Sequence, residues 1–354
     1  MRAVKMLLTG GFLLIFSEAA WAQKAVWDSL NQEVLSLTLK QDFSAALPKA
    51  REALKLAEKT YGRNHLRTAQ SQNNLGFVLL NLNQFPQAET LLTRALKIFS
   101  NNPKADRADH VQALNSLAHI FLAKKAPARA ETLYTRALAL SQRAPITDSL
   151  LLAQTLNNLA GLYIQEEKYS PAESLYRRSL SIREKMLGPE SPAARQTLEN
   201  LIYLSARQKN YAAAESLTLK VLKMVGRFRN LYPLETANYQ NSLGTFCHLQ
   251  EKFAKAETLF QSALALREKN LGPENPLVAK TLDNLAEARK GQKKYEGLDS
   301  LYERIVKILE KSSGAENPAV VEKLEAIARF YESIGQDKTA KKWAARAERA
   351  RPKQ

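Results

Sequence analysis

The fold is decided by residues 155–186, which read TLNNLAGLYIQEEKYSPAESLYRRSLSIREKM. Four apolar residues in the first half of this stretch stand at i, i+3, i+4 and i+7, which is one face of a helix: Leu156, Leu159, Ala160 and Tyr163. Residues 166–168 are polar and predict a turn. Ser170 and Pro171 then fit the N-cap and the first turn of a second helix. The stretch therefore predicts two helices joined by a short turn.

The same pattern returns every 42 residues. One leucine column recurs without a slip and contains Leu75, Leu117, Leu159, Leu201, Leu243 and Leu285, followed by Ile327. A column of small residues in the second helix contains Ala46, Ala88, Ala130, Ala172, Ala214, Ala256 and Ala340, with Leu298 as the exception. An array of equal units must bury the same face of each unit against its neighbour, whereas an ordinary globular enzyme has no reason to keep such a period.

The repeat predicts an all-α fold, a right-handed α-solenoid of about eight helical hairpins, because no strand-like alternation competes with the helical pattern. We expect residues 23–354 to form one solenoid domain. The units at about 26–65 and 319–350 depart from the pattern, since Glu33 replaces the recurring leucine and the last helix is polar and basic. Both units suit end caps, which face water on one side.

These units resemble the tetratricopeptide repeat (TPR) in the 42-residue form of kinesin light chains. The residues that carry the resemblance are Thr155, Leu156, Asn157, Asn158, Leu159, Ala160, Tyr163, Tyr169, Ala172, Glu173 and the linker Leu187-Gly188-Pro189-Glu190. Residues 271–276, LGPENP, form a second copy of the linker. The resemblance covers nearly all of residues 26–350, and it implies a scaffold that binds other proteins.

The first 22 residues differ from the rest of the chain. Arg2 and Lys5 precede an apolar run over about residues 6–16, and a small-x-small pattern at residues 20–22 fits a cleavage site. This order of segments is typical of a secretory signal peptide, and the apolar run is too short to span a bilayer. We therefore expect cleavage before Gln23 and a periplasmic or secreted protein without a transmembrane segment.

The composition narrows the classes of partner. The chain of 354 residues has 52 Lys and Arg against 35 Asp and Glu, a net charge of +17 that is spread along its length. Nucleic acid is not an expected partner of an exported protein, but an anionic envelope surface or an acidic protein is compatible with this charge. Cys247 is the single cysteine, so the chain forms no internal disulfide, and its column predicts a buried small hydrophobe.

Polar residues form three columns at the positions that the resemblance assigns to a peptide-binding groove lined by the first helices. The first column contains Gln70, Gln112, Gln154, Gln196 and Asn238. The second contains Asn73, Asn115, Asn157, Glu199, Asn241 and Asp283. The third contains Asn74, Ser116, Asn158, Asn200, Ser242 and Asn284. An amide offers a donor and an acceptor, so such columns can pair with the backbone of an extended peptide.

Two interpretations of these amides stay open: they bind a peptide, or they bond to neighbouring units and support the stack. His119 lies one helical turn after Asn115 and is a further candidate for the groove. The TPR carboxylate clamp requires Lys and Arg in these columns, where this chain has mainly amides and an isolated Arg329. Recognition of a free peptide C-terminus by that clamp is therefore not expected.

The sequence carries no catalytic signature. It lacks G-x-S-x-G, H-E-x-x-H and a glycine-rich phosphate loop, and its four histidines have no metal-ligand spacing. We therefore predict an exported, non-enzymatic scaffold without a metal or cofactor, which holds a protein or peptide segment in its groove. The alternative is an envelope-associated structural protein that binds anionic polymer or membrane through its basic exterior.

Overall fold

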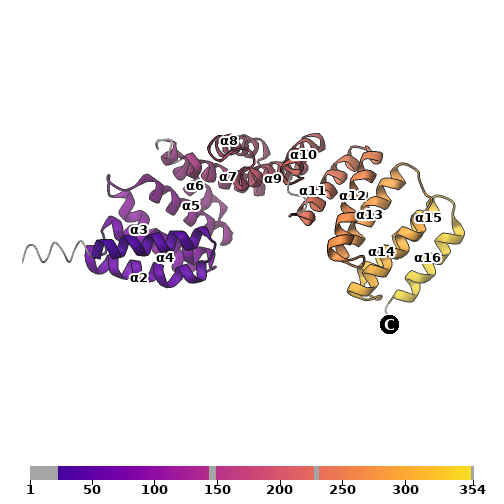
Figure 1. Ribbon diagram of the computed structural model, residues 1–354, viewed down its shortest axis with the longest axis horizontal. Coiled ribbons are helices and arrows are strands. Elements are labelled where there is room, and N and C mark those ends of the chain that lie inside the picture. Colours follow the sequence, from indigo (N-terminus) through magenta and orange to yellow (C-terminus); the bar gives the residue numbers. More distant parts are fainter. Residues whose placement is uncertain (1–22, 143–148, 227–230, 352–354) are drawn as a thin grey trace, which may run out of the picture. The chain divides into compact units, whose positions relative to one another are not determined.

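A computed structural model describes residues 23–142, 149–226 and 231–351, and these residues form helices and turns without a strand. The predicted signal peptide lies outside the described residues. The chain divides into two compact units, one up to Ser191 and one from Pro192. Figure 1 shows the helices in chain order within each unit. The boundary between the units falls between two successive hairpins.

The first unit contains four helical hairpins. Its elements are a helix over residues 23–39, α2 (Phe43–Tyr61), α3 (Leu66–Asn81), α4 (Phe85–Ser100), α5 (Arg107–Ala123), α6 (Pro127–Ser141), α7 (Ser149–Gln165) and α8 (Tyr169–Leu187). In each hairpin we call the helix before the turn the first helix and the helix after it the second helix. Each first helix from α3 onward packs on its own second helix and on the second helix of the hairpin before it.

The second unit repeats the same arrangement with four more hairpins. Its elements are α9 (Pro192–Arg207), α10 (Tyr211–Gly226), α11 (Pro233–Leu249), α12 (Phe253–Leu271), α13 (Pro276–Gly291), α14 (Leu298–Ser313), α15 (Pro318–Ser333) and α16 (Asp337–Ala350). The predicted fold class, an all-α solenoid of about eight hairpins, is confirmed.

The recurring residues form the core. All seven members of the leucine column, from Leu75 to Ile327, are at most 5% exposed. Six alanines of the small-residue column are fully buried, and the seventh, Ala340, is 8% exposed. Cys247 is also buried, as its column predicts. Small side chains let the two helices of a hairpin approach closely, and the leucines fill the space beside them.

One residue in every hairpin turn has a left-handed backbone. Seven of these residues are not glycine and have φ of 57–59°, and the eighth is Gly335: Gln41, Asn83, Lys125, Glu167, Lys209, Glu251, Lys293 and Gly335. The next N–H bonds back to a carbonyl five residues earlier, as from Lys168 N to Tyr163 O at 2.8 Å. This pair of features is a Schellman end to the first helix.

The structure of this turn corrects the predicted N-cap of the second helix. The second helix α8 begins at Tyr169 with Lys168 at the N-cap, so Ser170 is not the cap. The left-handed residue Glu167 completes the turn early, and the chain is helical again before the serine. At the other end of α8, Gly188 is the C-cap with φ 87°, a conformation that suits the glycine of the linker.

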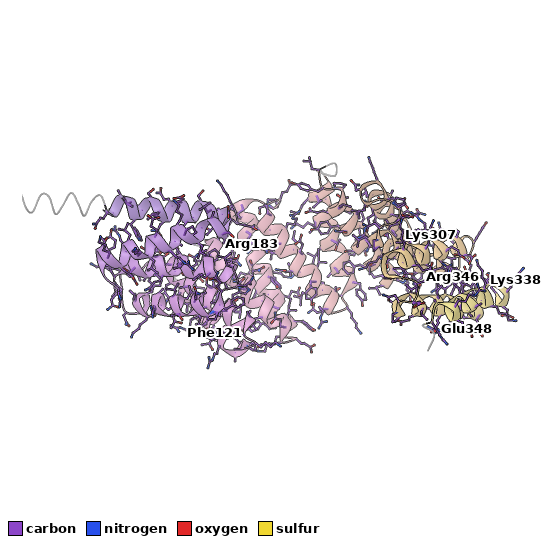
Figure 2. The ribbon with its side chains drawn as sticks, turned by 90° about the horizontal axis from the view of Figure 1, so that it is seen from below. Phe121, Arg183, Lys307, Lys338, Arg346 and Glu348 are labelled. Carbon is purple, nitrogen blue, oxygen red and sulfur yellow. The ribbon has the colours of Figure 1, made fainter. Side chains whose placement is uncertain are left out.

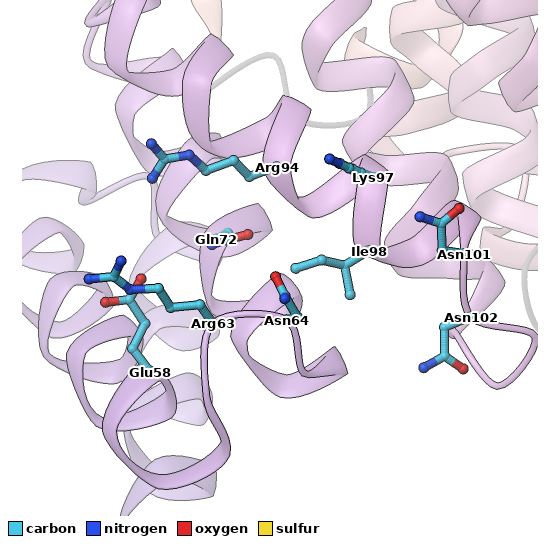
Figure 3. Close-up of a pocket in the computed structure, with 9 residues that line it drawn as sticks. All are labelled: Glu58, Arg63, Asn64, Gln72, Arg94, Lys97, Ile98, Asn101 and Asn102. Atoms are coloured by element: carbon cyan, nitrogen blue, oxygen red, sulfur yellow. The ribbon is translucent and has the colours of Figure 1, made fainter.

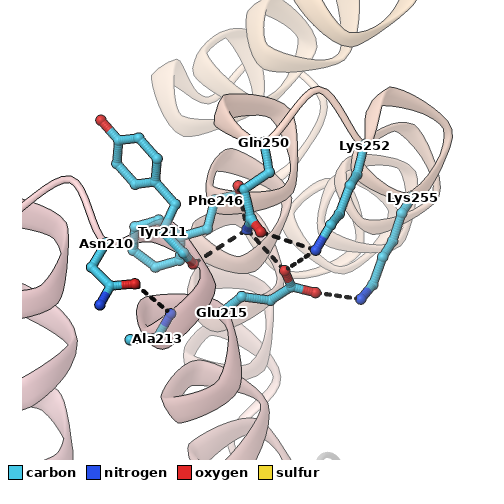
Figure 4. Close-up of polar contacts among 8 residues, drawn as sticks. All are labelled: Asn210, Tyr211, Ala213, Glu215, Phe246, Gln250, Lys252 and Lys255. Atoms are coloured by element: carbon cyan, nitrogen blue, oxygen red, sulfur yellow. Dashed lines mark hydrogen bonds and ion pairs between the residues drawn. The ribbon is translucent and has the colours of Figure 1, made fainter.

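Polar contacts join the second helix of one hairpin to the turn of the next hairpin. Glu215 on α10 accepts hydrogen bonds from Lys252 Nζ at 2.8 Å, Lys255 Nζ at 2.6 Å and Gln250 Nε2 at 2.8 Å (Figure 4). The bonds to the two lysines lower the pKa of the Glu215 carboxyl to about 2. Glu257, one repeat later, accepts equivalent bonds from Gln292 Nε2 at 2.8 Å and Lys294 Nζ at 3.3 Å.

The last helix, α16, ends the array with one apolar face and one charged face. Trp343 is fully buried, and its Nε1 donates to Asp299 Oδ1 at 2.7 Å. Arg346 forms ion pairs with Glu303 at 2.6 Å and Glu310 at 2.9 Å. Figure 2 labels Lys338, Arg346 and Glu348 on this helix. Among the described residues, none of the helices is long and apolar enough to cross a membrane.

Candidate peptide-binding groove

The first three first helices of the chain form a groove of about 660 Å³. It is lined by Asp28, Asn31, Gln32, Val34, Leu35, Thr38, Leu39, Asn74, Phe77, Asp109 and Gln112. These residues come from the helix over residues 23–39, from α3 and from α5. Two of them, Asn74 and Gln112, belong to the predicted columns.

Exposed apolar side chains lie in this groove beside the amides. Leu35 is 59% exposed and Leu39 is 77% exposed, which makes them the most exposed leucines described in the first unit. Phe77 on α3 is half-buried in the same groove. Clustered apolar groups open to water are typical of a surface that binds another molecule.

The amides of the groove bond to one another across successive first helices. Asn74 Nδ2 donates to Asn31 Oδ1 at 2.8 Å, and Asn73 Nδ2 donates to Gln112 Oε1 at 3.4 Å. These bonds join neighbouring first helices that line the groove. They support the interpretation in which amides join neighbouring units, and Asn74 also lines the open groove.

The charges in this groove are acidic. Its lining includes Asp28 and Asp109 and has no lysine or arginine. Burial is the main cause that raises the pKa of Asp109, and the nearby Asp106 adds to it, although Gln70 Nε2 donates a hydrogen bond of 2.7 Å to its carboxylate. A partly buried carboxylate without a cation beside it favours a ligand that brings a positive charge.

The predicted residues further along the first unit differ in exposure. Asn115, Ser116 and Asn157 are buried, whereas Gln154 and His119 are exposed. Asn115 bonds to Thr155, and its Oδ1 has no hydrogen-bond partner among the described residues. The buried Oδ1 of Asn73 also has no hydrogen-bond partner among the described residues, so Asn73 and Asn115 each have an unpaired acceptor.

Gln154 and Asn158 form a pair on α7. Gln154 Nε2 donates to Asn158 Oδ1 at 2.8 Å, and Gln154 Oε1 accepts from Arg183 at 3.0 Å. Arg183 is only 3% exposed and comes from the second helix α8. Arg183 was not among the predicted residues, although it and Arg267, two repeats later, are the two charged members of a column that is otherwise apolar or small between residues 57 and 309.

Five predicted residues belong to the second unit. They are Gln196 and Asn200 on α9, Asn238 and Asn241 on α11, and Asn284 on α13. Asn284 Nδ2 donates to Asn241 Oδ1 at 3.1 Å, the same kind of bond between first helices as in the first unit. Asn238 is exposed and accepts from the buried Arg267 at 2.8 Å. Gln196 is exposed and Asn200 is half-buried.

The 42-residue period could have predicted some of the groove residues that were missed. Asp28 and Asn31 stand 42 residues before Gln70 and Asn73, so the predicted columns extend into the first hairpin. The exposed Leu35 and Leu39 had no such signal, because a leucine on a helix gives the same pattern whether or not another element covers it.

The described residues hold no cluster of three His, Cys, Asp or Glu side chains that could bind a metal ion. The chemistry of the groove is hydrogen bonding through amides, apolar contact and acidic charge. These features can bind a polypeptide segment.

Comparisons with known proteins agree with this architecture. A family model described as the tetratricopeptide repeat matches residues 29–101, 109–185 and 235–297, which is more than half of the chain. The chain belongs to the tetratricopeptide repeat family. Its TPR units are of the 42-residue, kinesin light chain-like type. TPR proteins are in general scaffolds that bind protein partners rather than enzymes. No curated protein matched the sequence.

Several solved structures share this TPR fold. The kinesin light chain TPR-like repeats of Podosopora anserina are 18% identical, with a TM-score of 0.51 over 59% of this chain and 98% of that chain. The apo form of RapI is 19% identical, with a TM-score of 0.51 over 79% and 99% of the two chains. The apo quorum sensor NprR of B. thuringiensis is 14% identical, with a TM-score of 0.54 over 91% and 86%. These similarities show the fold alone.

Proposed function

We propose that this TPR protein is an exported, non-enzymatic scaffold, which holds an extended segment of a partner protein in the groove between the helix over residues 23–39, α3 and α5. The observation that carries the proposal is the groove itself: two exposed leucines of the helix over residues 23–39 lie beside amides from three successive first helices. The amides are spaced by the packing of the helices, so they suit a ligand with regular backbone groups.

The lining indicates the chemistry of the segment. Apolar side chains of the partner would cover Leu35, Leu39 and Phe77, and the removal of this apolar surface from water would supply the favourable free energy. A Lys or Arg of the partner would pair with Asp28 and Asp109, which face no basic residue of the groove lining. The preferred partner is therefore an extended segment with apolar residues and at least one basic residue.

The test uses the mature chain, residues 23–354, to capture proteins from an envelope fraction and then measures the affinity of the recovered partner. Leu39→Asp should weaken that affinity by at least 10-fold, because it places a charge on the apolar wall. Leu231→Asp is the matched control, since Leu231 is 71% exposed and lies in the other unit. If the two variants bound the partner with equal affinity, the proposed groove would be wrong.

A second pair of substitutions tests the amides beyond this groove. Asn158→Ala combined with Asn200→Ala should weaken binding if the segment continues along the later first helices, and the helical circular dichroism should stay unchanged. Unchanged binding by the double variant would confine the partner to the groove described above.

Export is part of the proposal and rests on the pattern of residues 1–22. Expression of the full chain in its native cell, followed by N-terminal sequencing of the periplasmic and secreted fractions, should give a protein that starts at Gln23. A full-length protein that stays in the cytosol would contradict export.

The alternative function is attachment to an anionic polymer or membrane surface through the basic exterior, and the observation that favours it is the net charge of +17. Such binding should fall steeply between about 50 and 200 mM salt, since exposed charges are screened over about 10 Å at 0.1 M. An association that survives this range and is lost on Leu39→Asp would exclude the alternative.

A further inference from the structure

A second cleft, of about 870 Å³, lies between α2 and α4, with α3 at its base. It is lined by Glu58, Arg63, Asn64, Gln72, Arg94, Lys97, Ile98, Asn101 and Asn102 (Figure 3). Gln72 stands two residues before Asn74 on α3, which is a rotation of about 200° around the helix. The cleft and the peptide-binding groove therefore lie on different faces of α3.

Gln72 is an unusual residue for the base of this cleft. It is 3% exposed, and its Oε1 is buried without a hydrogen-bond partner among the described residues. The equivalent residue in five other hairpins is a fully buried leucine: Leu114, Leu156, Leu198, Leu282 and Leu324. An unpaired buried amide costs free energy that a leucine would not, so an amide at this position points to a ligand that pairs with it.

Three cations surround the amide. Arg63, Arg94 and Lys97 line the cleft, all three are exposed, and the described residues form no ion pair with any of them. The only acidic residue in the lining is Glu58. The cleft therefore carries a local excess of positive charge beside a buried amide oxygen that can accept from a peptide N–H.

The same chain contains a copy of this cleft in which the charges are paired. Residues 210 positions later correspond to the cleft residues, and there Arg304 pairs with Glu268 at 2.6 Å. Lys311 pairs with Glu274. Glu274 and Lys311 correspond to Asn64 and Asn101, so the first cleft lacks this ion pair.

Two further differences between the clefts add polar or charged groups to the first one. The proline of the linker, Pro273, is replaced by Arg63, which adds a cation. The buried Leu282 is replaced by Gln72, which adds a hydrogen-bonding group at the base. Asn101 replaces Lys311, which removes one cation from the first cleft. The first cleft is still the more basic of the two, because it has three cations and one carboxylate where the copy has three cations and two carboxylates. This balance favours an anion from outside the chain.

We propose that this cleft binds an acidic peptide segment, whose carboxylates pair with Arg63, Arg94 and Lys97 while one of its backbone N–H groups donates to Gln72 Oε1. The size of the cleft favours a peptide over a single small anion. Ile98 offers apolar contact, and Asn64, Asn101 and Asn102 offer amides for peptide groups. This second site goes beyond the proposed groove, and both can be occupied because they lie on different faces of α3.

The experiment measures binding of a fluorescent ten-residue peptide rich in Glu and Leu to the mature chain, residues 23–354, by fluorescence anisotropy at about 50 mM salt. Arg63→Gln combined with Arg94→Gln should weaken binding by at least 10-fold. Gln72→Leu should weaken it several-fold, and it should leave the fold intact because leucine occupies this position in five other hairpins.

Two matched controls separate the cleft from general charge and packing effects. Arg178→Gln removes an exposed arginine at the position equivalent to Arg94, and it should not change binding. Gln240→Leu replaces the other glutamine of this column, which is half-buried and also has a buried, unpartnered Oε1. In its hairpin the positions of the three cations hold Leu231, Ser262 and Ala265. This variant should bind the peptide as the parent does.

Three outcomes would overturn the proposal. Binding that is equal in the parent and in the variants Gln72→Leu and Arg63→Gln with Arg94→Gln would exclude the cleft. Equal binding of a Gln-for-Glu peptide would exclude recognition of carboxylates. Competition by inorganic phosphate at the same concentration as the peptide would show a site for small anions instead. Leu39→Asp, the variant that tests the groove, should leave this binding unchanged, so the two proposals fail independently.

Discussion

Asn115 Nδ2 on α5 donates a hydrogen bond of 2.8 Å to Thr155 Oγ1 on α7, which joins the first helices of two successive hairpins across 40 residues of sequence. Thr155 is fully buried and donates in turn to Leu151 O at 3.0 Å. A predicted groove residue thus takes part in a buried chain of hydrogen bonds. The amide columns have a structural role at such positions, whatever they bind elsewhere.

Asn115→Ala should therefore lower the free energy of unfolding by about 1–2 kcal/mol, because Thr155 loses a buried partner. Chemical denaturation followed by circular dichroism measures the change. His119→Ala is a suitable comparison, since His119 is exposed on the same helix, and it should cost less than Asn115→Ala. A loss below about 0.5 kcal/mol for Asn115→Ala would mean that the bond does not support the stack.

Acid should weaken the link between α10 and the next hairpin. The two lysine hydrogen bonds hold the pKa of Glu215 at about 2, below the value of about 4.3 for an unfolded chain. The contribution of this carboxylate to stability is therefore fully present above about pH 4.3 and is lost as the pH falls toward 2.

Glu215→Gln should remove this pH dependence and cost about 1–2 kcal/mol near pH 7, since one charge of the cluster is lost. The measurement is the free energy of unfolding of both proteins between pH 7 and pH 2.5. The difference between them should shrink as the pH falls below 4. A difference that stays constant over this range would contradict the assignment.

The left-handed turn residues offer a way to stabilise the array. Lys125 has φ of 57°, a region in which a glycine avoids the steric cost of a side chain. Lys125→Gly should raise the free energy of unfolding by up to about 1 kcal/mol. Gly335→Ala tests the same physics in reverse and should lower it by about 1 kcal/mol, because Gly335 has φ of 74°. In thermal unfolding, the midpoint temperature should rise for Lys125→Gly and fall for Gly335→Ala.

The sequence predicted what neighbouring hairpins share and missed what only one hairpin has. Leu159 belongs to a column that packs in the same way in every unit, so its period was enough to place it in the core. The exposure of Leu39 depends on which element lies beside the first hairpin. The sequence of one helix does not show which element packs against it. The departure of Gln72 from a leucine column was visible in the sequence, but its lack of a hydrogen-bond partner required coordinates.

Leu159→Ala should lower the free energy of unfolding by about 2–5 kcal/mol, as for other buried leucines that leave a cavity. Leu159 is 3% exposed. Leu187→Ala on the same unit is the control, since Leu187 is 47% exposed and its loss should cost less than about 0.5 kcal/mol. Similar losses for the two variants would contradict the packing described for the leucine column.

Arg267 is the clearest case of a stabilising residue that the repeat pattern hides. It is 4% exposed on α12, donates to Thr281 Oγ1 at 2.6 Å and Leu277 O at 3.1 Å on α13, and donates to Asn238 Oδ1 at 2.8 Å on α11. Burial lowers the pKa of the guanidinium, but arginine stays charged in proteins. The charge is therefore held inside by these three acceptors alone, as far as the described residues extend.

Arg267→Ala should cost about 3 kcal/mol, because it removes three hydrogen bonds and leaves a cavity. Arg267→Met should cost less, since it keeps most of the volume and Val225 fills the equivalent position one repeat earlier at 4% exposure. Urea denaturation of the two variants measures the difference. Equal losses would mean that the hydrogen bonds alone, and not the filled volume, determine the stability at this position.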